Sequence, residues 1–590
     1  MTALLEIENL NVHFALADGD VHAVKDASLS IQEGECLGVV GESGSGKSQL
    51  FLAAFGLLAS NGRVAGKVKY RGEEILGAPA KRLNALRGGA VTMIFQDPLT
   101  SLTPHMKIGG QIVEALMLHR RVPRAEAEQR AREMLDYVRI PESARRLKQY
   151  PHELSGGMRQ RVMIAMATIT GPDLIIADEP TTALDVTVQA QILEILRALK
   201  TDKKTAIAMV SHDMGVIAGL ADRVQVMRHG EIVESGSADE IFYTPRHDYT
   251  RMLLDAIPKA GEKPTPVTAV GAPLLTVDDL KVSFPVKDAG FLRFGKTQLL
   301  RALDGISFTL HQGETLGVVG ESGCGKSTLA RAVLQLLPKT GGRVVWLGRD
   351  LDATTQSDIR KLREDFQIVF QDPLASLDPR MPVGLSIAEP LKSLEPQLSR
   401  EALRQKVRAM MQRVGLEPGW INRYPHELSG GQNQRVGLAR AMIVGPKMLV
   451  CDEAVSALDV SIQAQIVDLI RDLQAETRLA LIFISHDLSV VRRLSHRVMV
   501  LYLGRVVELA PSGVLYANPR HPYTRALLSA VLSPDPRAER VRKRELLTGD
   551  LPSPLDPRAQ LTFLKSRLDQ PGYRPRLEQV ATDHWVAEHD

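Results

Sequence analysis

The chain contains the same series of short motifs twice, in the same order. GVVGESGSGKS at 38–48 returns as GVVGESGCGKS at 317–327, and ADEPTTALDV at 177–186 returns as CDEAVSALDV at 451–460. From the LSGG segments onward the two copies keep a constant offset of 274 positions, as between Ser155 and Ser429. A period of this length corresponds to a whole domain rather than to one unit of a solenoid. The sequence therefore predicts two complete domains of the same kind.

The boundary between these domains is predicted in the segment PKAGEKPTPVTAVGAP at 258–273. Its four prolines, separated by small and charged residues, are typical of a semi-extended linker. We therefore expect one domain at 1–257 and a second at 274–532. A tail rich in proline and arginine, 533–590, has no counterpart in the first half, and the sequence assigns it no role.

Short apolar runs alternate with helical patterns in each half. DLIIADE in the first half and KMLVCDE in the second are typical of fully buried strands. Strands that alternate with helices predict an α/β fold in which helices cover both faces of a parallel sheet. Between Pro98 and Ser155 the pattern is mostly helical, which indicates a helical subdomain inserted into the α/β core.

Charge and composition exclude several classes of function. The 590 residues carry a net charge of only +4, so there is no electrostatic footprint for nucleic acid. The three cysteines lack disulfide or metal-ligand spacing, which favours a reduced cytosolic compartment. The N-terminus has no signal-peptide pattern, and no run of 18 apolar residues predicts a membrane span. Any link to a membrane is therefore expected to run through partner proteins.

Two loops, 41–48 and 320–327, match G-x-x-x-x-G-K-[ST], each directly after a strand and before a helix. Glycines allow the backbone amides of such a loop to converge on a polyphosphate. Lys47 and Lys326 are expected to reach the β- and γ-phosphates, and Ser48 and Ser327 to hold Mg²⁺. The candidate phosphate-binding residues are Gly41, Ser43, Gly44, Gly46, Lys47, Ser48, Gly320, Ser322, Gly323, Gly325, Lys326 and Ser327.

An Asp-Glu pair ends a later apolar strand in each half, at Asp178–Glu179 and Asp452–Glu453. An aspartate at the carboxyl end of such a strand lies where α/β sheets bind ligand, and it can hold Mg²⁺ through water. The following glutamate is then placed to act as general base toward an attacking water. The alternative is a pair that only caps the next helix, and the phosphate loop upstream argues against it.

A histidine and a glutamine complete the candidate site in each half. His212 and His486 follow the next apolar strand, where a neutral imidazole could bind the γ-phosphate and position water. Gln96 and Gln371 follow a strand and open the helical insertion. Either residue type at such a junction is usually structural, so these roles depend on the rest of the constellation.

The LSGG segments predict a second anion-binding position. Ser155 and Gly157, like Ser429 and Gly431, lie where a helix is expected to begin, and a helix N-terminus capped by serine attracts anions. One domain does not need two phosphate sites. The second position is therefore expected to serve the nucleotide of the other domain.

In this combination the motifs resemble the nucleotide-binding domains of ABC transporters over about residues 1–530. The Walker A loop, glutamine loop, LSGG signature, Walker B strand with its glutamate, ALD loop (183–185 and 457–459) and switch histidine occur in order, twice. The resemblance implies that each domain has a RecA-like core with a small antiparallel β part. It further implies ATP hydrolysis with Mg²⁺, whose implied ligands are Ser48, Gln96, Asp178, Ser327, Gln371 and Asp452.

The same resemblance implies that the two domains pair head to tail. One ATP would then lie between Lys47 and the signature 429–431, and the other between Lys326 and the signature 155–157. Phe14 and Phe284 are candidates to stack on adenine, although an aromatic side chain on a strand more often packs into the core.

Softer features indicate the subfamily. QDPLTSLTP, QDPLASLDP and the closing segments HDYTRMLL (247–254) and HPYTRALL (521–528) are similar to the ATPases of peptide, nickel and opine importers. A single chain with both halves resembles the fused ATPases of bacterial microcin C, oligopeptide and glutathione importers. This implies two transmembrane permease subunits, an external solute-binding protein, and a peripheral place on the cytoplasmic face of the inner membrane. The transported solute is not specified, because such specificity lies in the other chains.

Three positions depart from the family pattern. Met158 follows the first LSGG where glutamine is usual, Gln49 follows Ser48, and Ala454 follows Glu453. None of these is expected to touch phosphate, metal or water, so both sites are expected to be competent, if unequal. The tail lacks cysteine, so we expect no iron–sulfur cluster there.

Three alternatives belong to other classes. A twin-cassette ATPase acting on ribosomes would have a long charged helical linker, and near-neutral charge fits RNA poorly. A DNA-repair ATPase would need zinc-ligand cysteines or long coiled coils. An exporter ATPase is disfavoured by the closing HxYTRxLL segments.

Overall fold

The computed structural model describes residues 3–16, 19–182, 184–257, 273–287, 297–456, 458–545, 547, 552–556, 558–570 and 572–590. The chain divides into two compact units. The first, here called the first cassette, comprises Met1–Ile257 with Leu532–Gly549, and the second cassette comprises Pro258–Val531 with Asp550–Asp590. The predicted linker, apart from Pro273, and Ala183 and Ala457 of the ALD loops lie outside the described residues.

A six-stranded sheet forms the centre of the first cassette, in the order β10-β9-β3-β8-β7-β6. All neighbours in it are parallel except β10, which runs antiparallel to β9. Strands β3, β7 and β8 are buried along their whole length, as expected for a parallel sheet covered on both faces. The strands are β3 (Cys36–Val40), β6 (Val91–Ile94), β7 (Leu174–Asp178), β8 (Ala206–Ser211), β9 (Arg223–Arg228) and β10 (Glu231–Ser237).

A second, antiparallel sheet has the order β2-β1-β4-β5. Its strands are β1 (Leu5–Leu16), β2 (Gly19–Ile31), β4 (Gly62–Tyr70) and β5 (Glu73–Glu74). One apolar cluster joins residues of this sheet, such as Leu5 and Val68, to Leu174 and Ala208 of the parallel sheet. The small antiparallel part that the family resemblance implied is therefore packed on the α/β core.

Helices surround these sheets, and those from α3 to α7 form the insertion predicted after Pro98. The helices of the first cassette are α1 (Lys47–Ala54), α2 (Ala80–Leu86), α3 (Pro98–Ser101), α4 (Ile108–His119), α5 (Arg124–Tyr137), α6 (Ser143–Arg146), η1 (Pro151–Glu153), α7 (Gly156–Thr168), α8 (Val186–Lys203), α9 (Met214–Leu220), α10 (Ala238–Tyr243), α11 (Asp248–Asp255) and α22 (Pro536–Val541). Residues of α4, α5 and α7 share one buried apolar cluster with residues of the central sheet, so the insertion is packed against the α/β core.

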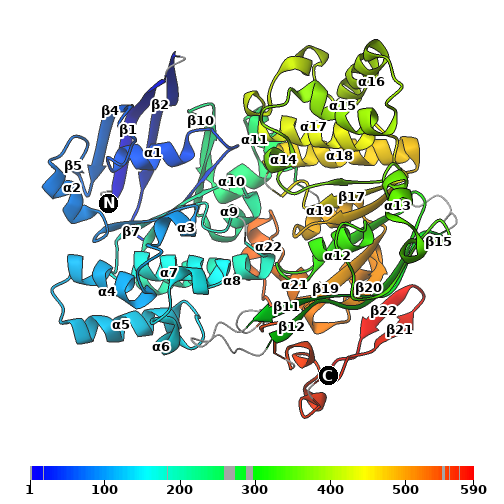
Figure 1. The fold of residues 1–590 in the computed structure, drawn as a ribbon. Coiled ribbons are helices and arrows are strands. Elements are labelled where there is room, and N and C mark those ends of the chain that lie inside the picture. The colour runs from blue at the N-terminus through cyan, green and yellow to red at the C-terminus, as the bar shows by residue number, and fades with distance from the viewer. Residues whose placement is uncertain are drawn as a thin grey trace. The chain divides into compact units, whose positions relative to one another are not determined.

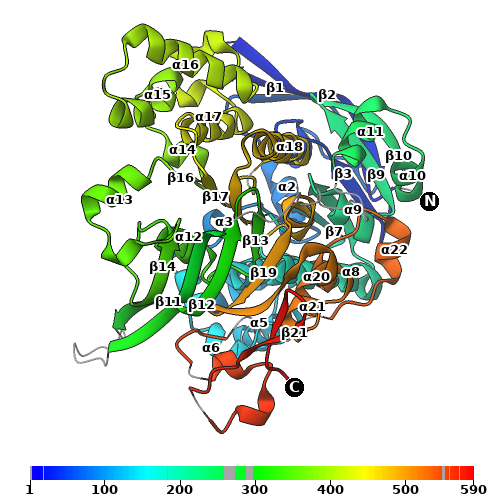
Figure 2. The ribbon, with the colours of Figure 1, turned by 90° about the vertical axis from the view of Figure 1, so that its right-hand side faces the viewer.

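The second cassette repeats this plan with a larger central sheet, β16-β17-β18-β13-β19-β20-β22-β21. Its antiparallel sheet has the order β12-β11-β14-β15, and Figure 2 shows β11, β12 and β14 side by side. The strands are β11 (Pro273–Lys287), β12 (Thr297–His311), β13 (Thr315–Val319), β14 (Gly341–Trp346), β15 (Arg349–Asp350), β16 (Phe366–Val369), β17 (Met448–Asp452), β18 (Ala480–Ile484), β19 (Arg497–Tyr502), β20 (Arg505–Pro511), β21 (Leu577–Ala581) and β22 (His584–Ala587).

The helices of the second cassette follow one another in the same order along the chain as those of the first. They are α12 (Lys326–Val333), η2 (Leu351–Ala353), α13 (Gln356–Leu362), α14 (Pro373–Ser376), α15 (Val383–Leu394), α16 (Arg400–Arg413), η3 (Pro418–Asn422), η4 (Pro425–Glu427), α17 (Gly430–Met442), α18 (Val460–Thr477), α19 (Leu488–Leu494), α20 (Ser512–Ala517), α21 (Pro522–Ala530), η5 (Ala559–Leu561) and η6 (Lys565–Arg567). The predicted fold class, two tandem cassettes with helical insertions, is confirmed.

The tail is divided between the two units. Segment 532–549 belongs to the first cassette, where α22 packs against α9 (Figure 1). There the buried Glu539 and Arg544 form an ion pair, and Arg544 also lies 3.2 Å from Glu194 of α8. Segment 550–590 belongs to the second cassette, where β22 extends the central sheet beside β20. Among the helices described, none is both long and apolar enough to cross a membrane.

Candidate functional site

The first phosphate loop ends at Gly46, and α1 begins at Lys47. Gly46 has a left-handed backbone (φ 97°), and a Cβ there would lie 2.4 Å from the carbonyl oxygen of Ala23, so only glycine fits. The Lys47 Nζ donates to the carbonyl oxygens of Gly41 and Glu42, both at 2.8 Å. The ammonium is thereby held inside the loop, where the phosphates of a nucleotide are expected.

The second loop has the same construction. Gly325 has a φ of 109°, and a Cβ there would lie 2.5 Å from the carbonyl oxygen of Ala302. The Lys326 Nζ donates to the carbonyl oxygens of Gly320 at 2.7 Å and Glu321 at 3.1 Å. The exposed tips of the two loops consist of the predicted residues Ser43, Gly44, Ser322 and Gly323.

In each cassette two candidate metal ligands, the serine of the phosphate loop and the aspartate at the end of β7 or β17, lie in direct contact. The Ser48 Oγ donates to Asp178 Oδ1 at 2.8 Å, and the Ser327 Oγ donates to Asp452 Oδ1 at 2.9 Å. Burial raises the pKa of Asp178 and of Asp452 above the ordinary value, and the serine hydrogen bond opposes it. A buried carboxylate beside a hydroxyl is the oxygen donor set that Mg²⁺ prefers. The residues present therefore fit the metal.

Glu179 follows β7 and has its carboxylate held by three side chains. The Gln96 Nε2 donates to Oε2 at 2.8 Å, the Thr182 hydroxyl donates to Oε2 at 2.9 Å, and His212 Nδ1 lies 3.1 Å from Oε1. Burial acts to raise the pKa of Glu179, but the hydrogen bond and charge of His212, with Thr182 and Lys47, outweigh it. The pKa therefore lies below its ordinary value, and the group is ionised at neutral pH.

Glu453 occupies the same position after β17 but has different contacts. The Gln371 Nε2 donates to its Oε2 at 2.8 Å, while His486 Nδ1 lies 3.7 Å from Oε2 and Lys326 Nζ lies 3.8 Å from Oε1. His486 lowers the pKa of Glu453 and burial opposes this, so the net shift is again downward. Both glutamates adopt a left-handed backbone, with φ of 48° at Glu179 and 50° at Glu453.

The signature serines cap the helices predicted to begin there. Ser155 precedes α7 and accepts from the Met158 amide at 3.2 Å, and Ser429 precedes α17 and accepts from the Gln432 amide at 3.3 Å. In the second cassette the Gln432 side chain also accepts from the Ser429 amide at 2.9 Å, which completes a capping box. A methionine cannot return this bond, so the first signature has one hydrogen bond fewer of this type.

The second glycine of each signature packs closely against the next long helix. A Cβ at Gly157 would lie 2.6 Å from Val188, and one at Gly431 would lie 2.4 Å from Ile462. A larger residue would therefore push α7 away from α8, or α17 away from α18.

The adenine candidates differ in exposure. Phe14 lies on β1, partly buried against the apolar cluster that joins the two sheets of the first cassette. Phe284 lies on β11 and is 36% exposed. Their stacking on adenine stays a prediction.

The sequence interpretation missed two kinds of residue. Thr182, which holds the carboxylate of Glu179, lies three positions beyond it in the repeated segment 177–186, where the second copy has Ser456. Tyr249 and Tyr523 belong to closing segments that were noted for their resemblance alone, yet their hydroxyls contact the phosphate loops. The signal available was the repetition of His-x-Tyr-Thr-Arg at the end of both halves.

Comparison with known proteins identifies the family of the chain. Residues 24–182 and 303–456 match the family described as ABC transporter, and residues 233–274 and 507–559 match the C-terminal region of oligopeptide/dipeptide transporters. The chain is 45% identical to the glutathione import ATP-binding protein GsiA of Pectobacterium atrosepticum, over 99% of this chain and 97% of that protein. It is also 45% identical to GsiA of Escherichia coli K12, with the same coverage.

Among solved structures, the dimeric ATP-binding cassette MJ0796 bound to ADP and Pi is 27% identical, with a TM-score of 0.37, and covers 40% of this chain and 98% of that one. The two family matches together extend over both cassettes, and the similarity to GsiA proteins spans nearly the whole chain. The chain belongs to the ABC transporter family, as an ATP-hydrolysing member with two cassettes fused in one polypeptide.

Proposed function

We propose that this chain energises the import of peptides or peptide-like solutes, of the size of glutathione, across the bacterial inner membrane. The observation that carries the proposal is the presence of a complete candidate hydrolysis site in each cassette, within a chain 45% identical to glutathione import ATP-binding proteins. The match of 233–274 and 507–559 to the C-terminal region of oligopeptide/dipeptide transporters supports the solute class.

Each site would divide the work among its own side chains. Lys47 and Lys326 would turn from the loop carbonyls to the ATP phosphates, which offer the ammonium a charged acceptor. Glu179 and Glu453, ionised because their pKa values are lowered, would accept the proton of the attacking water. Gln96, His212, Gln371 and His486 would hold these carboxylates and the water in place. Mg²⁺, held by Ser48 and Asp178 or by Ser327 and Asp452, would neutralise phosphate charge.

We further propose that the sites are shared head to tail between the cassettes. ATP bound at Lys47 would be covered by Ser429–Gly431, and ATP bound at Lys326 by Ser155–Gly157. Ser155 and Ser429 are exposed within their own cassettes, and each opens a helix of 13 residues, whose N-terminus attracts phosphate.

The partners would be two transmembrane permeases that the cassettes contact at the cytoplasmic face of the membrane. A solute-binding protein outside would deliver the cargo. Closure of the cassettes on ATP and their opening after hydrolysis would move the permeases between inward-facing and outward-facing states.

Affinity purification of the full chain from detergent-solubilised native membranes tests this proposal. We expect two multi-span permeases and a solute-binding protein to be recovered, and the ligand eluted from that binding protein should be a peptide or a peptide-like thiol. Recovery of ribosomal proteins without permeases, or of an export channel, would contradict it.

A further inference from the structure

The segments that close the two cassettes, 247–254 and 521–528, have no part in the hydrolysis chemistry described above. In both cassettes this segment forms a helix, α11 or α21, whose first turn carries a buried tyrosine. Tyr249 is 2% exposed and Tyr523 is fully buried. A buried tyrosine hydroxyl requires a hydrogen-bond partner, and here the partner is the phosphate loop.

Each tyrosine hydroxyl contacts the first peptide unit of its loop. The Glu42 amide donates to the Tyr249 hydroxyl at 3.1 Å, and the Glu321 amide donates to the Tyr523 hydroxyl at 3.1 Å. The carbonyl of the same peptide unit, from Gly41 or Gly320, accepts from the loop lysine. A trans peptide points its N–H and C=O in opposite directions, so tyrosine and lysine fix this unit from its two sides.

The helix that carries the tyrosine is itself fixed from the central sheet. Glu234 of β10 accepts from the amides of Arg246 and His247, and the His247 Nδ1 accepts from the Tyr249 amide at 3.1 Å. The second cassette repeats every contact. Glu508 of β20 accepts from the amides of Arg520 and His521, and the His521 Nδ1 accepts from the Tyr523 amide at 3.1 Å.

We propose that Tyr249 and Tyr523 are positioning residues for ATP, and that the histidine and tyrosine of each closing segment, together with the glutamate of β10 or β20, form a brace for the phosphate loop. The brace presents the loop in its nucleotide-binding shape before ATP arrives, so that less binding energy is spent on ordering it. The proposal rests on the proposed function only in taking these loops as the ATP sites.

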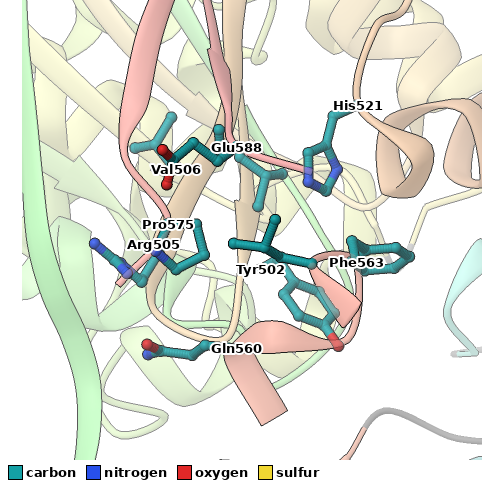
Figure 3. A pocket seen from close by; sticks show the side chains of 11 residues that line it. Tyr502, Arg505, Val506, His521, Gln560, Phe563, Pro575 and Glu588 are labelled. Atoms are coloured by element: carbon teal, nitrogen blue, oxygen red, sulfur yellow. The ribbon is translucent and has the colours of Figure 1, made fainter. Parts of the chain in front are cut away.

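Different residues pack against the tyrosine rings of the two braces. The guanidinium of Arg228 lies 4.8 Å from the Tyr249 ring centroid. At the corresponding position of the second cassette, the Tyr502 ring lies 4.8 Å from Tyr523, and Phe563 of segment 550–590 lies 5.3 Å from Tyr502 and 5.2 Å from His521. Figure 3 shows Tyr502, His521 and Phe563 around one pocket.

The tail also contacts the glutamate of the second brace. His584 of β22 lies with its Nε2 2.9 Å from Glu508 Oε1, and both side chains are buried. Burial, together with the neighbouring His589, lowers the pKa of His521 to about 3, which keeps that imidazole neutral and its Nδ1 able to accept. Segment 550–590 therefore acts on the second phosphate loop through the brace.

The test compares Tyr249→Phe, Tyr523→Phe and the double variant in the full chain. A matched control is Tyr70→Phe, which removes a tyrosine hydroxyl that contacts Asp173 at 2.5 Å, away from the loops. Binding of a fluorescent ATP analogue and the KM and kcat for ATP are measured. Loss of the hydroxyl leaves a loop amide without this acceptor, so each single variant should weaken ATP binding at the phosphate loop of its own cassette by about tenfold. The kcat at saturating ATP should change less than about twofold.

A Phe563→Ala variant extends the test to the tail. It should weaken ATP binding at the same phosphate loop as Tyr523→Phe and leave ATP binding at the other loop unchanged. ATP affinity equal to that of wild type in the double tyrosine variant would overturn the proposal, as would an equal loss in Tyr70→Phe. The comparison of each variant with wild type concerns ATP affinity alone. It therefore remains informative if the purified wild-type chain lacks permease partners and the importer proposal fails.

Discussion

Glu179 and Glu453 follow equivalent strands of the two cassettes, but different neighbours hold their carboxylates. In the first cassette His212 is 3.1 Å from the carboxylate and the Thr182 hydroxyl donates to it. In the second, His486 is 3.7 Å away, and Ser456, at the position of Thr182, donates to the main-chain carbonyl of Glu453. The same motifs thus produce a more tightly fixed carboxylate in the first cassette than in the second, and the two hydrolysis rates are expected to differ.

The largest effect is expected from removing these carboxylates. Glu179→Gln and Glu453→Gln keep the size of the side chain but cannot accept a proton, so the double variant should lose hydrolysis by about 10²-fold to 10⁴-fold while binding ATP normally. The single variants, assayed as ATPases in the assembled transporter, should leave unequal residual rates. Unchanged turnover in the double variant would rule out the general-base role.

A smaller effect on the rate of hydrolysis should distinguish the two sites directly. Thr182→Ala removes a hydrogen bond to an ionised carboxylate and should slow hydrolysis by about threefold to tenfold. The matched variant Ser456→Ala removes a bond to a main-chain carbonyl and should change the rate by less than about twofold. Single-turnover hydrolysis measures both, and equal effects would show that Thr182 does not distinguish the sites.

The signature helices offer a comparison through stability. Gln432→Met converts the second signature to the type found in the first and removes the return bond of the capping box. This should cost about 0.5–1 kcal/mol and speed amide exchange in the first turn of α17, with no change in α7. Hydrogen–deuterium exchange followed by peptide mass spectrometry measures it. An unchanged exchange rate in α17 would show that this bond contributes nothing.

The smallest effect concerns pH. Burial lowers the pKa of His486, but the carboxylate of Glu453 outweighs it, and the net shift is above the ordinary 6.5. The stabilisation from this histidine is therefore complete below pH 6.5 and is lost as the pH rises through its pKa in the folded protein. The lowered pKa of Glu453 makes its share present above pH 4.5 and lost on further acidification.

His486→Gln should accordingly lower the Tm of the full chain more at pH 5.5 than at pH 8.5. The histidine is partly exposed, so the effect should be below about 1 kcal/mol. Thermal unfolding at the two pH values measures the difference. A decrease in Tm that is the same at both would contradict the assignment of the pair.

The spacing of residues within short motifs was sufficient to predict the phosphate loops and the ligand positions at the ends of the parallel strands. The phosphate loops need glycine at Gly46 and Gly325 because a Cβ would meet a carbonyl, and this requirement is visible in the sequence. The contact of Ser48 with Asp178 follows from the rule that ligand sites lie at the carboxyl ends of parallel strands.

Long-range packing was not predictable from spacing. The division of the tail depends on contacts between residues far apart in the sequence: Arg544 lies 3.2 Å from Glu194 of α8 in the first cassette, and Phe563 joins an aromatic cluster in the second. The tyrosine hydroxyls reach amides 207 and 202 positions away in the sequence, a contact that no local pattern encodes.

The head-to-tail sharing of the ATP sites is tested most directly by counting occluded ATP in chains that carry both Glu179→Gln and Glu453→Gln. Lys47→Ala with Ser429→Arg should damage the same site twice, so such a chain should still occlude ATP at its other site. Lys47→Ala with Ser155→Arg should damage both sites and abolish occlusion. The opposite result, in which the pair within one cassette spares a site and the pair across cassettes abolishes occlusion, would show that each cassette completes its own site and would contradict the account.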